Sequence, residues 1–390
     1  MRSSGFSLSS AVPFILMKSI PFLCPVTFKR SGVSAPNRIA LAAMTNQQSL
    51  PDGSASDDEH RWLTLRAEGG FGIVTTCAAH VHPRGRGWPG ALGIDSDARL
   101  PGLKRLADGI HKHGALSLVQ IFHGGARAPS KLTGMPPISA SPGNLPGEPK
   151  GQAAVEATEE DIAEVTAAFA GAARRAEAAG WNGVEIHGAH GYLPAQFLSP
   201  LSNRRRDRWG GSLDNRMRFL RGIFAAVKEA VSPRFLVGVR LSPRNFPGQD
   251  AETTCEAFTV ARTLIGDGAD FIHFSLWDFR TTLDEAEKSE DHATVPRLLD
   301  LAVESVAGQC PLFVAGKIHT PADAEEAIQS GADVAALGRV AIPYADWPRR
   351  AERGDFVPAS PPYPANDLST AGVGEPFLDY LRRWPGFVEG

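Results

Sequence analysis

The chain has 390 residues, of which 43% are hydrophobic and 21% are charged, and its formal net charge is −3 at pH 7. This composition is that of a globular protein with a large core, and it excludes disordered, fibrous and strongly basic chains. The basic residues are scattered and nearly balanced by acidic ones, so we expect neither a nucleic-acid partner nor membrane binding. The four cysteines stand far apart without a CxxC pair, which favours a reducing, cytoplasmic compartment and no cysteine-ligated metal.

The first residues carry no regular pattern. An apolar stretch, Phe6 to Met17, follows Arg2, but Pro13 and several serines interrupt it, which is atypical of a secretory leader. No later apolar run approaches the ~20 residues of a membrane-spanning helix. We therefore predict a disordered extension over residues 1–20.

Short apolar runs then alternate with amphipathic segments along the chain. The runs predict eight β-strands, at Arg38–Met44, Phe71–Ala78, Ala115–Phe122, Gly183–His187, Leu236–Leu241, Phe271–Leu276, Leu312–Ala315 and Val334–Gly338. Helical patterns lie between them, for example at Ala157–Ala179, Asn215–Val231 and Pro321–Ser330. Repeated strand–helix units predict parallel strands, and eight of them predict an α/β fold closed into a (β/α)8 TIM barrel.

The barrel accounts for residues 21–350 as a single domain with extended loops. The segment Leu132–Gln152 is rich in Pro, Gly and Ser and is long for a connection, so we expect a functional or subunit-contact loop. Residues 351–390 form a C-terminal tail with a helical pattern near Pro376–Arg383. The tail packs either on its own barrel or on a neighbouring one, which leaves a homo-oligomer open.

The carboxyl ends of barrel strands meet at one face, where active sites of this architecture collect. The first strand ends in Ala42-Ala43-Met44-Thr45-Asn46-Gln47, the second reaches Ala78, and the third contains Gln120. Small side chains let a flat ring lie against the backbone, and Thr45 and Gln120 offer polar atoms to the edge of such a ring.

The fourth strand runs into His187-Gly188-Ala189-His190-Gly191-Tyr192. Two imidazoles three residues apart can converge on one oxygen and stabilise negative charge that develops there. A tyrosine is protonated at neutral pH, so Tyr192 can deliver a proton. An isolated histidine pair is more often structural, but this pair follows a barrel strand and is flanked by glycines, which favours catalysis.

Cationic side chains and glycines stand at three further strand ends. Arg240 lies at the end of the fifth strand and suits an anionic ring, with an ion pair at the barrel end as the structural alternative. The last two strands close with Gly316-Lys317 and Gly338-Arg339. Barrels commonly bind phosphate at these two loops, where glycine lets backbone N–H groups approach and Arg339 can bind in bidentate fashion.

The sequence around the fourth strand resembles the old yellow enzyme family. The most specific motif is Glu185-Ile186-His187-Gly188-Ala189-His190-Gly191-Tyr192-Leu193, followed by Gln196-Phe197-Leu198-Ser199-Pro200 and Trp209-Gly210-Gly211-Ser212. The similarity extends from Pro36-Asn37-Arg38 to Gly338-Arg339. It implies an FMN-dependent oxidoreductase that is reduced by NADH or NADPH. Its small-molecule substrates would be activated alkenes, namely enones, maleimides, nitroalkenes or quinones.

The resemblance also implies roles for individual residues. By motif position, non-covalently bound FMN would contact Ala42, Ala43, Met44, Thr45, Ala78, Gln120, Arg240, Gly316, Gly338 and Arg339. His187 and His190 would hold the electron-withdrawing oxygen of the substrate. Flavin N5 would pass a hydride to the β carbon, Tyr192 would deliver a proton to the α carbon, and the kinetics would be ping-pong. Thr45 stands where one family branch has Cys, and Gln47, a candidate substrate contact, stands where another branch has Tyr.

Two other functions fit parts of the sequence. His80 and His82, together with His187 and His190, offer imidazole ligands to a metal-dependent barrel hydrolase. No carboxylate is spaced to complete such a site, so we expect no metal. The second alternative is a flavin-binding module without turnover, although nothing in the set of His187, His190 and Tyr192 indicates loss of catalysis.

Overall fold

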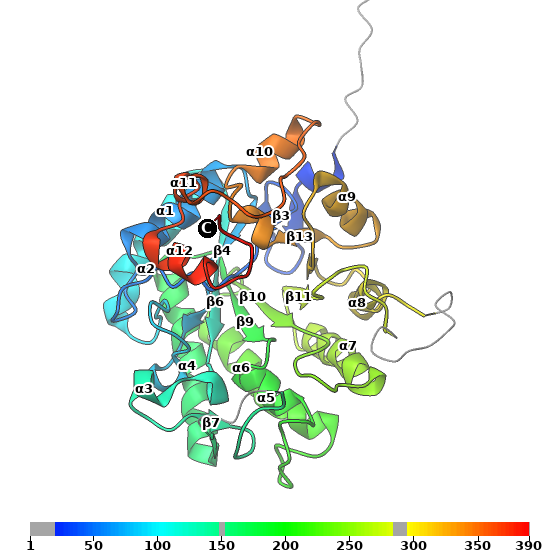
Figure 1. Ribbon diagram of the computed structural model, residues 1–390. Coiled ribbons are helices and arrows are strands. Elements are labelled where there is room, and N and C mark those ends of the chain that lie inside the picture. Colours follow the sequence, from blue (N-terminus) through cyan, green and yellow to red (C-terminus); the bar gives the residue numbers. More distant parts are fainter. Residues whose placement is uncertain (1–19, 148–152, 284–294, 390) are drawn as a thin grey trace, which may run out of the picture.

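Eight parallel strands close into a barrel surrounded by helices in the computed structural model, which describes residues 20–147, 153–283 and 295–389 (Figure 1). The strands are β3 (Ile39–Leu41), β4 (Ile73–Thr75), β6 (Leu116–Phe122), β9 (Gly183–Gly188), β10 (Leu236–Leu241), β11 (Phe271–Ser275), β12 (Leu312–Ala315) and β13 (Val334–Leu337). Neighbours follow chain order, and β13 pairs with β3, which closes the ring. The predicted (β/α)8 fold is confirmed. The extension predicted over residues 1–20 lies outside the described residues except for Ile20.

A helix follows each barrel strand along the chain. These helices are α1 (Asp57–Glu68), α2 (Leu100–His111), α4 (Glu159–Ala178), α6 (Leu213–Ala230), α7 (Ala251–Gly266), α8 (Leu298–Val306), α9 (Pro321–Gln329) and α10 (Trp347–Glu352). Two of them begin at capping boxes, in which Thr158 and Thr320 accept hydrogen bonds from backbone N–H groups three residues later. Within the described residues, no helix combines the length and apolarity needed to cross a membrane.

Shorter elements connect these units. They are η1 (Pro21–Leu23), β1 (Val26–Phe28), β2 (Val33–Ala35), β5 (Ala79–His80), η2 (Pro83–Gly85), η3 (Asp97–Arg99), η4 (Gly125–Arg127), α3 (Ser130–Thr133), β7 (Ile138–Ser139), β8 (Val155–Glu156), α5 (Leu193–Leu198), η6 (Arg339–Ala341), α11 (Ala365–Thr370) and α12 (Glu375–Leu381). The expected long loop, Leu132–Gln152, lies partly outside the described residues. Its strand β7 pairs in parallel with β8.

The predicted second strand, Phe71–Ala78, is interrupted near its end. β4 stops at Thr75, and β5 takes up the pairing with the last two residues of β6. At the break, the Thr76 hydroxyl donates to the carbonyl of Cys77 (2.6 Å) and accepts from the backbone N–H of Gln120 (3.2 Å). These local hydrogen bonds replace regular pairing and leave Ala78 outside the ladder, near the carboxyl ends of the strands.

An aromatic plug fills the amino-terminal end of the barrel. Phe28, on the β1–β2 hairpin, lies 5.9 Å from the ring of Phe271 and 6.1 Å from that of Phe313, which stack on each other at 4.7 Å. A Cβ on Gly238 of β10 would come within 2.3 Å of the Phe271 ring, so only glycine leaves room for the plug. The apolar floor confines polar side chains to the opposite, carboxyl end.

The C-terminal tail packs against α1 of the same chain (Figure 1). In α12, Phe377 meets Trp62 edge-to-face with ring centroids 5.1 Å apart. The backbone N–H of Gly374 donates to Oε1 of Gln48, just after the first barrel strand (2.7 Å). The tail therefore covers the segment that leads from the mouth of the barrel into α1.

Arg66 of α1 joins the tail to the end of the last strand. Its guanidinium is fully buried, 3.2 Å from the centroid of the Trp62 ring. It donates to the carbonyls of Ala341 (2.9 Å), Ile342 (2.8 Å) and Ala371 (2.6 Å). The same side chain thus fixes the segment after β13 and the tail against α1.

We expect Arg66→Met to lower the free energy of unfolding by ~3 kcal/mol or more, because several buried carbonyls lose a charged donor. Urea unfolding would measure the loss. Arg61→Met, at an exposed position of the same helix, is the control and should change stability by less than ~0.5 kcal/mol. Equal stability of the two variants would contradict this role of Arg66.

Candidate active site

Parallel pairing gathers the predicted site residues at the carboxyl ends of the strands. Ala42, Ala43, Met44 and Thr45 follow β3, Ala78 lies between β4 and β5, Gln120 lies in β6, Arg240 in β10, and Gly316, Gly338 and Arg339 follow β12 and β13. Arg240 connects opposite sides of this end. Its Nη1 donates to the carbonyl of Ala43 (3.2 Å), and its Nη2 donates to Oγ of Ser275 at the end of β11 (3.3 Å).

His187, His190 and Tyr192 converge at the end of β9. The ring of His187 lies 5.0 Å from that of His190 and 4.9 Å from that of Tyr192, with interplanar angles of 81° and 74°. His190 adopts a left-handed backbone conformation with φ 57°, uncommon for a residue other than glycine. The guanidinium of Arg127 donates to the carbonyl of His190 and lies 5.8 Å from the centroid of the Tyr192 ring.

Hydrogen bonds to each imidazole select which nitrogen can donate into the site. Nδ1 of His187 accepts from the backbone N–H of Ala189 (3.3 Å), so the proton of a neutral His187 resides on Nε2. Nε2 of His190 lies 2.8 Å from Oγ of Ser275. The Ser275 hydroxyl can donate to this nitrogen while its oxygen accepts from Arg240, and in that arrangement the N–H of a neutral His190 is on Nδ1. Each ring then keeps one N–H donor.

Both imidazoles are uncharged at neutral pH. Burial lowers the pKa of His187 well below its ordinary value, and the nearby His190 and Arg240 lower it further. Burial likewise lowers the pKa of His190, with Arg240 as the next cause. The pair can therefore stabilise a partial negative charge on an oxygen by hydrogen bonding, without holding a full positive charge in the ground state.

A buried carboxylate, Glu185, lies two residues before His187 on β9 and therefore on the same face of the strand. Its Oε2 is 2.6 Å from Nδ1 of His273 on β11, and its Oε1 accepts from Nε2 of Gln120 on β6 (2.6 Å). Burial alone would raise the pKa of Glu185, but the interactions with His273, Arg240 and Gln120 outweigh it and lower the pKa. Glu185 is thus an ionised acceptor that ties three barrel strands together.

Gln120 and Arg240 each keep one polar atom for a ligand. The amide nitrogen of Gln120 is committed to Glu185, so its carbonyl oxygen is the atom left to accept a hydrogen bond. Nε of Arg240 is buried and has no hydrogen-bond partner within the described part of the chain. An acceptor and an unsatisfied charged donor fit the N–H and carbonyl groups along one edge of a flavin ring.

The loops after β12 and β13 fit the phosphate of such a group. A Cβ on Gly316 would come within 2.9 Å of the backbone nitrogen of Phe279, so only glycine is accommodated there. A Cβ on Gly338 would meet only Sδ of Met44, at 3.7 Å, which leaves its backbone open. The cationic side chain of Arg339 is exposed beside Gly338, and that of Lys317, also exposed, is paired with Asp278 (3.1 Å). Bare backbone and positive charge suit a phosphate.

An aromatic wall borders the site on the side of Tyr192. Trp88 stacks on Phe122 with ring centroids 5.0 Å apart, and Phe122 meets Tyr192 edge-to-face at 5.2 Å. The loop that carries Trp88 packs on the end of the first strand, since a Cβ on Gly90 would lie 2.2 Å from the carbonyl oxygen of Gln47. Gln47 itself has a left-handed backbone with φ 55°.

The imidazoles that motivated a metal site do not form one cluster. His82 pairs with Glu164 on the outer helix α4 (3.2 Å), away from the interior of the barrel. His80 lies 3.9 Å from Asp95. The described residues contain no group of three or more His, Cys, Asp or Glu side chains that could hold a metal ion.

Sequence reasoning did not assign roles to Glu185, His273 or Ser275. All three face partners on other strands, so no local pattern could reveal their contacts. Ser275 stands at the end of β11 and could have been found by the strand-end rule that identified Arg240.

Comparison with known proteins identifies the family. Residues 22–355 match the model of the NADH:flavin oxidoreductase / NADH oxidase family. The probable NADH-dependent flavin oxidoreductase YqiG of Bacillus subtilis is 39% identical over 372 residues, covering 94% of this chain and 97% of that protein. The structure of the old yellow enzyme homologue from Zymomonas mobilis is similar with a TM-score of 0.75 and 25% identity, covering 89% of this chain and 96% of that one.

A second group of relatives is much longer than this chain. The NADH:acrylate oxidoreductase of Vibrio harveyi is 35% identical over 328 residues, which are 83% of this chain but 32% of that protein. The chain therefore spans about a third of the length of that relative.

The buried histidines predict how stability depends on pH. Burial lowers the pKa of His123 to about 3 and that of His80 to about 4, whereas an unfolded histidine titrates near ~6.5. Below ~6.5 the unfolded chain binds protons that the folded chain does not. The free energy of unfolding should therefore fall as the pH drops from ~6.5 toward 4, by up to ~1.4 kcal/mol per pH unit for each such imidazole.

Urea unfolding between pH 7.5 and 4.5 would measure this slope. His123→Gln should flatten it, because one buried imidazole is removed, while His113→Gln, at a more exposed site, should leave it unchanged. The same slope in all three proteins would show that His123 does not resist protonation.

Glu185→Gln should weaken FMN binding about tenfold, because an amide cannot accept from both Gln120 and His273 and the orientation of Gln120 is lost. Titration of the apoprotein with FMN, followed by flavin fluorescence, would give the dissociation constant. Glu160→Gln, at an exposed position of α4, is the control. An unchanged dissociation constant in a correctly folded Glu185→Gln variant would refute the positioning role.

Proposed function

The chain belongs to the NADH:flavin oxidoreductase / NADH oxidase family, the old yellow enzymes, and is an FMN-dependent oxidoreductase with NADH or NADPH as reductant; from this we propose that it reduces activated carbon–carbon double bonds. The observation that carries the proposal is the convergence of His187, His190 and Tyr192 above the buried Arg240. The acceptor class comprises enones, maleimides, nitroalkenes and quinones, whose alkenes are conjugated to an electron-withdrawing oxygen.

Two sets of residues would hold FMN. Arg240 and Gln120, together with Ala42, Ala43, Met44, Thr45 and Ala78, would contact the ring, and Gly316, Gly338 and Arg339 would contact the phosphate. When bound, FMN supplies a carrier that accepts a hydride from the nicotinamide and passes one to the alkene. The two half-reactions would share one site, so we expect ping-pong kinetics.

His187 and His190 would activate the acceptor. Their N–H groups, on Nε2 and Nδ1, would donate to its carbonyl or nitro oxygen, on which negative charge grows as a hydride reaches the β carbon. Ser275 and the backbone of Ala189 hold the two rings in these tautomers. The imidazoles therefore need no rearrangement during the reaction.

Tyr192 would deliver a proton to the α carbon. Its ring is held between Phe122 and His187, and the cation of Arg127 lies 5.8 Å from the ring centroid. The aromatic neighbours fix the direction of the hydroxyl and keep the acceptor flat against the site.

The names of the longer relatives, NADH:acrylate and NADH:fumarate oxidoreductase, also point to electron-poor alkenes. This chain covers 32% and 36% of those proteins, so their activities are not transferred whole. The direct test is an anaerobic assay of the purified protein. Stoichiometric FMN, reduction by NADH or NADPH and reoxidation by cyclohexenone would support the proposal. A colourless protein with bound zinc would overturn it, and a flavoprotein that no alkene reoxidises would indicate a binding module.

Tyr192→Phe should slow reoxidation of the reduced enzyme by an enone about 10²-fold or more, the scale of general acid catalysis. Reduction by NADH should be unaffected, because the nicotinamide half-reaction needs no proton from Tyr192. Stopped-flow absorbance of the flavin measures both steps. Tyr380→Phe, in the C-terminal tail, is the matched control and should leave both rates unchanged. Equal slowing of both half-reactions in Tyr192→Phe would show a structural role instead.

A further inference from the structure

A cavity of about 260 Å³ opens between the loops that follow β10 and β11. Its described lining consists of Pro243, Arg244, Ser275, Leu276, Trp277, Thr281 and Leu298. Arg244 is the one charged side chain in this described lining, which contains no carboxylate. Ser275 is shared with the candidate active site, because its hydroxyl bonds to His190 (2.8 Å). The cavity is therefore a side pocket of the acceptor site.

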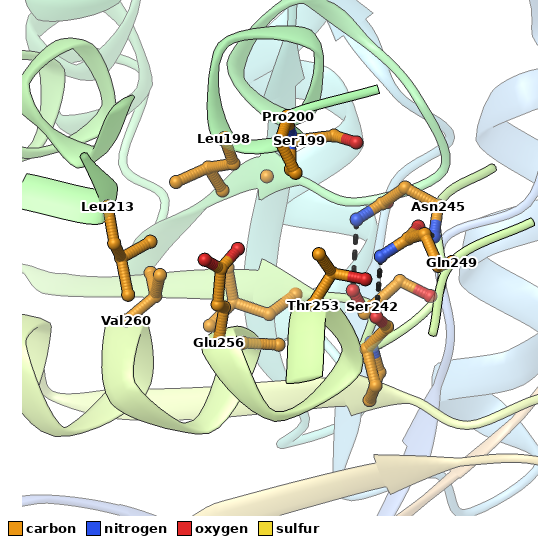
Figure 2. A pocket seen from close by; sticks show the side chains of 14 residues that line it. Leu198, Ser199, Pro200, Leu213, Ser242, Asn245, Gln249, Thr253, Glu256 and Val260 are labelled. Carbon is orange, nitrogen blue, oxygen red and sulfur yellow. Dashed lines mark hydrogen bonds between the residues drawn. The ribbon is translucent and has the colours of Figure 1, made fainter. Parts of the chain in front are cut away.

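The loop that carries Arg244 is held by its own amide side chains (Figure 2). Nδ2 of Asn245 donates to the carbonyl of Ser242 (3.0 Å), and Nε2 of Gln249 donates to that of Pro243 (3.2 Å). Oε1 of Gln249 in turn accepts from the backbone N–H of Phe246 (2.9 Å). These bonds hold the backbone before and after Arg244, so the fold fixes the position of this residue.

The guanidinium of Arg244 keeps an N–H donor that no described residue satisfies. Nη2 donates to the carbonyl of Leu283 (2.7 Å), whereas Nε is buried and without a hydrogen-bond partner among the described residues. A buried, unpaired N–H of a charged group is costly unless a ligand satisfies it. The planar guanidinium fits a carboxylate through two parallel hydrogen bonds.

Trp277 gives the same cavity an aromatic wall. Its side chain is 75% exposed, and its backbone is left-handed with φ 61°. This conformation is unfavourable for a bulky residue and is typical of functional positions. An indole displayed in this way offers a stacking face to a planar molecule that extends from His190 into the cavity.

We propose that Arg244 and Trp277 form a subsite for a carboxylate on a planar, conjugated acceptor whose carbonyl is held by His187 and His190. The proposal rests on the proposed function and narrows its substrate class to electron-poor alkenes that carry a second, anionic end. The cavity, at about 260 Å³, is slightly smaller than the ~300–1,000 Å³ range of ligand pockets, so it accommodates a carboxylated ring or chain rather than the adenosine diphosphate of a nicotinamide cofactor.

Two pairs of isosteric ligands test the subsite on the FMN-loaded enzyme. 4-Hydroxybenzoate and 4-hydroxybenzamide are non-reducible probes whose affinities follow from the change in flavin absorbance. 4-Carboxycinnamaldehyde and 4-carbamoylcinnamaldehyde are reducible acceptors for stopped-flow reoxidation. We expect wild type to bind the carboxylates more tightly than the amides, and Arg244→Gln to weaken the carboxylates about tenfold or more while changing the amides less than twofold.

Three further variants separate charge, stacking and fold. Arg244→Lys should retain part of the carboxylate preference, and Trp277→Ala should weaken both members of each pair alike. Arg234→Gln removes an exposed charge from the amino-terminal side of β10 and should change nothing. FMN content and the unfolding midpoint of each variant show whether it folds.

An unchanged ratio of carboxylate to amide affinity in Arg244→Gln would overturn the subsite. Weaker binding of NADH or NADPH in that variant, with the ratio unchanged, would assign Arg244 to the cofactor phosphates and likewise overturn it. Failure of the proposed function itself is distinguishable, because wild type would then oxidise NADH without transferring hydride to either cinnamaldehyde.

Discussion

The ionised Glu185 inside the barrel is the constraint on which the candidate site depends. A carboxylate at 1% exposure is tolerated only with close partners. The structure supplies them as Gln120 on β6, which pairs with β9, and His273 on β11, which lies on the far side of β10. The hydrogen bonds to Glu185 also fix the orientation of the Gln120 and His273 side chains. The polarity that a bound ring would meet is thus set by a charge that need not touch the ring.

The same negative charge explains how Arg240 can be buried beside two histidines. Glu185 balances the guanidinium electrostatically, as its effect on the pKa of Arg240 shows, although burial is the larger influence and lowers that pKa. Burial lowers the pKa of His187 and of His190, and the positive charge of Arg240 lowers both further, so the two rings are neutral. Under the proposed function, charge is therefore distributed so that the acceptor would meet neutral hydrogen-bond donors, while the cation of Arg240 would face FMN. This separation suits a reaction in which negative charge moves from one side to the other.

Much of this arrangement could be predicted from the sequence, because the rule involved is local. The period and length of the apolar runs identify the barrel strands, and a closed parallel barrel places the residues at the end of each strand on one face. The location of His187, Arg240 and Gly338 at that face could therefore be predicted without coordinates. The break at Thr76 could not, since a hydroxyl that satisfies the backbone is invisible to hydrophobic patterning. Contacts across the barrel, such as Ser275 with His190, join residues 85 positions apart and also escaped prediction.

The strands and the loops contribute different kinds of residue to the site. The buried polar groups Glu185, Gln120 and Arg240 lie on strands, where any change would disturb several partners at once. The residues on the acceptor side, Trp88 and Trp277, lie on loops with fewer mutual contacts and more exposure. Loops tolerate substitution better than the strands that support them. Hydride chemistry is therefore expected to persist among relatives of this chain while the acceptor changes, because the features that select the acceptor can vary without altering the charge balance beneath the ring.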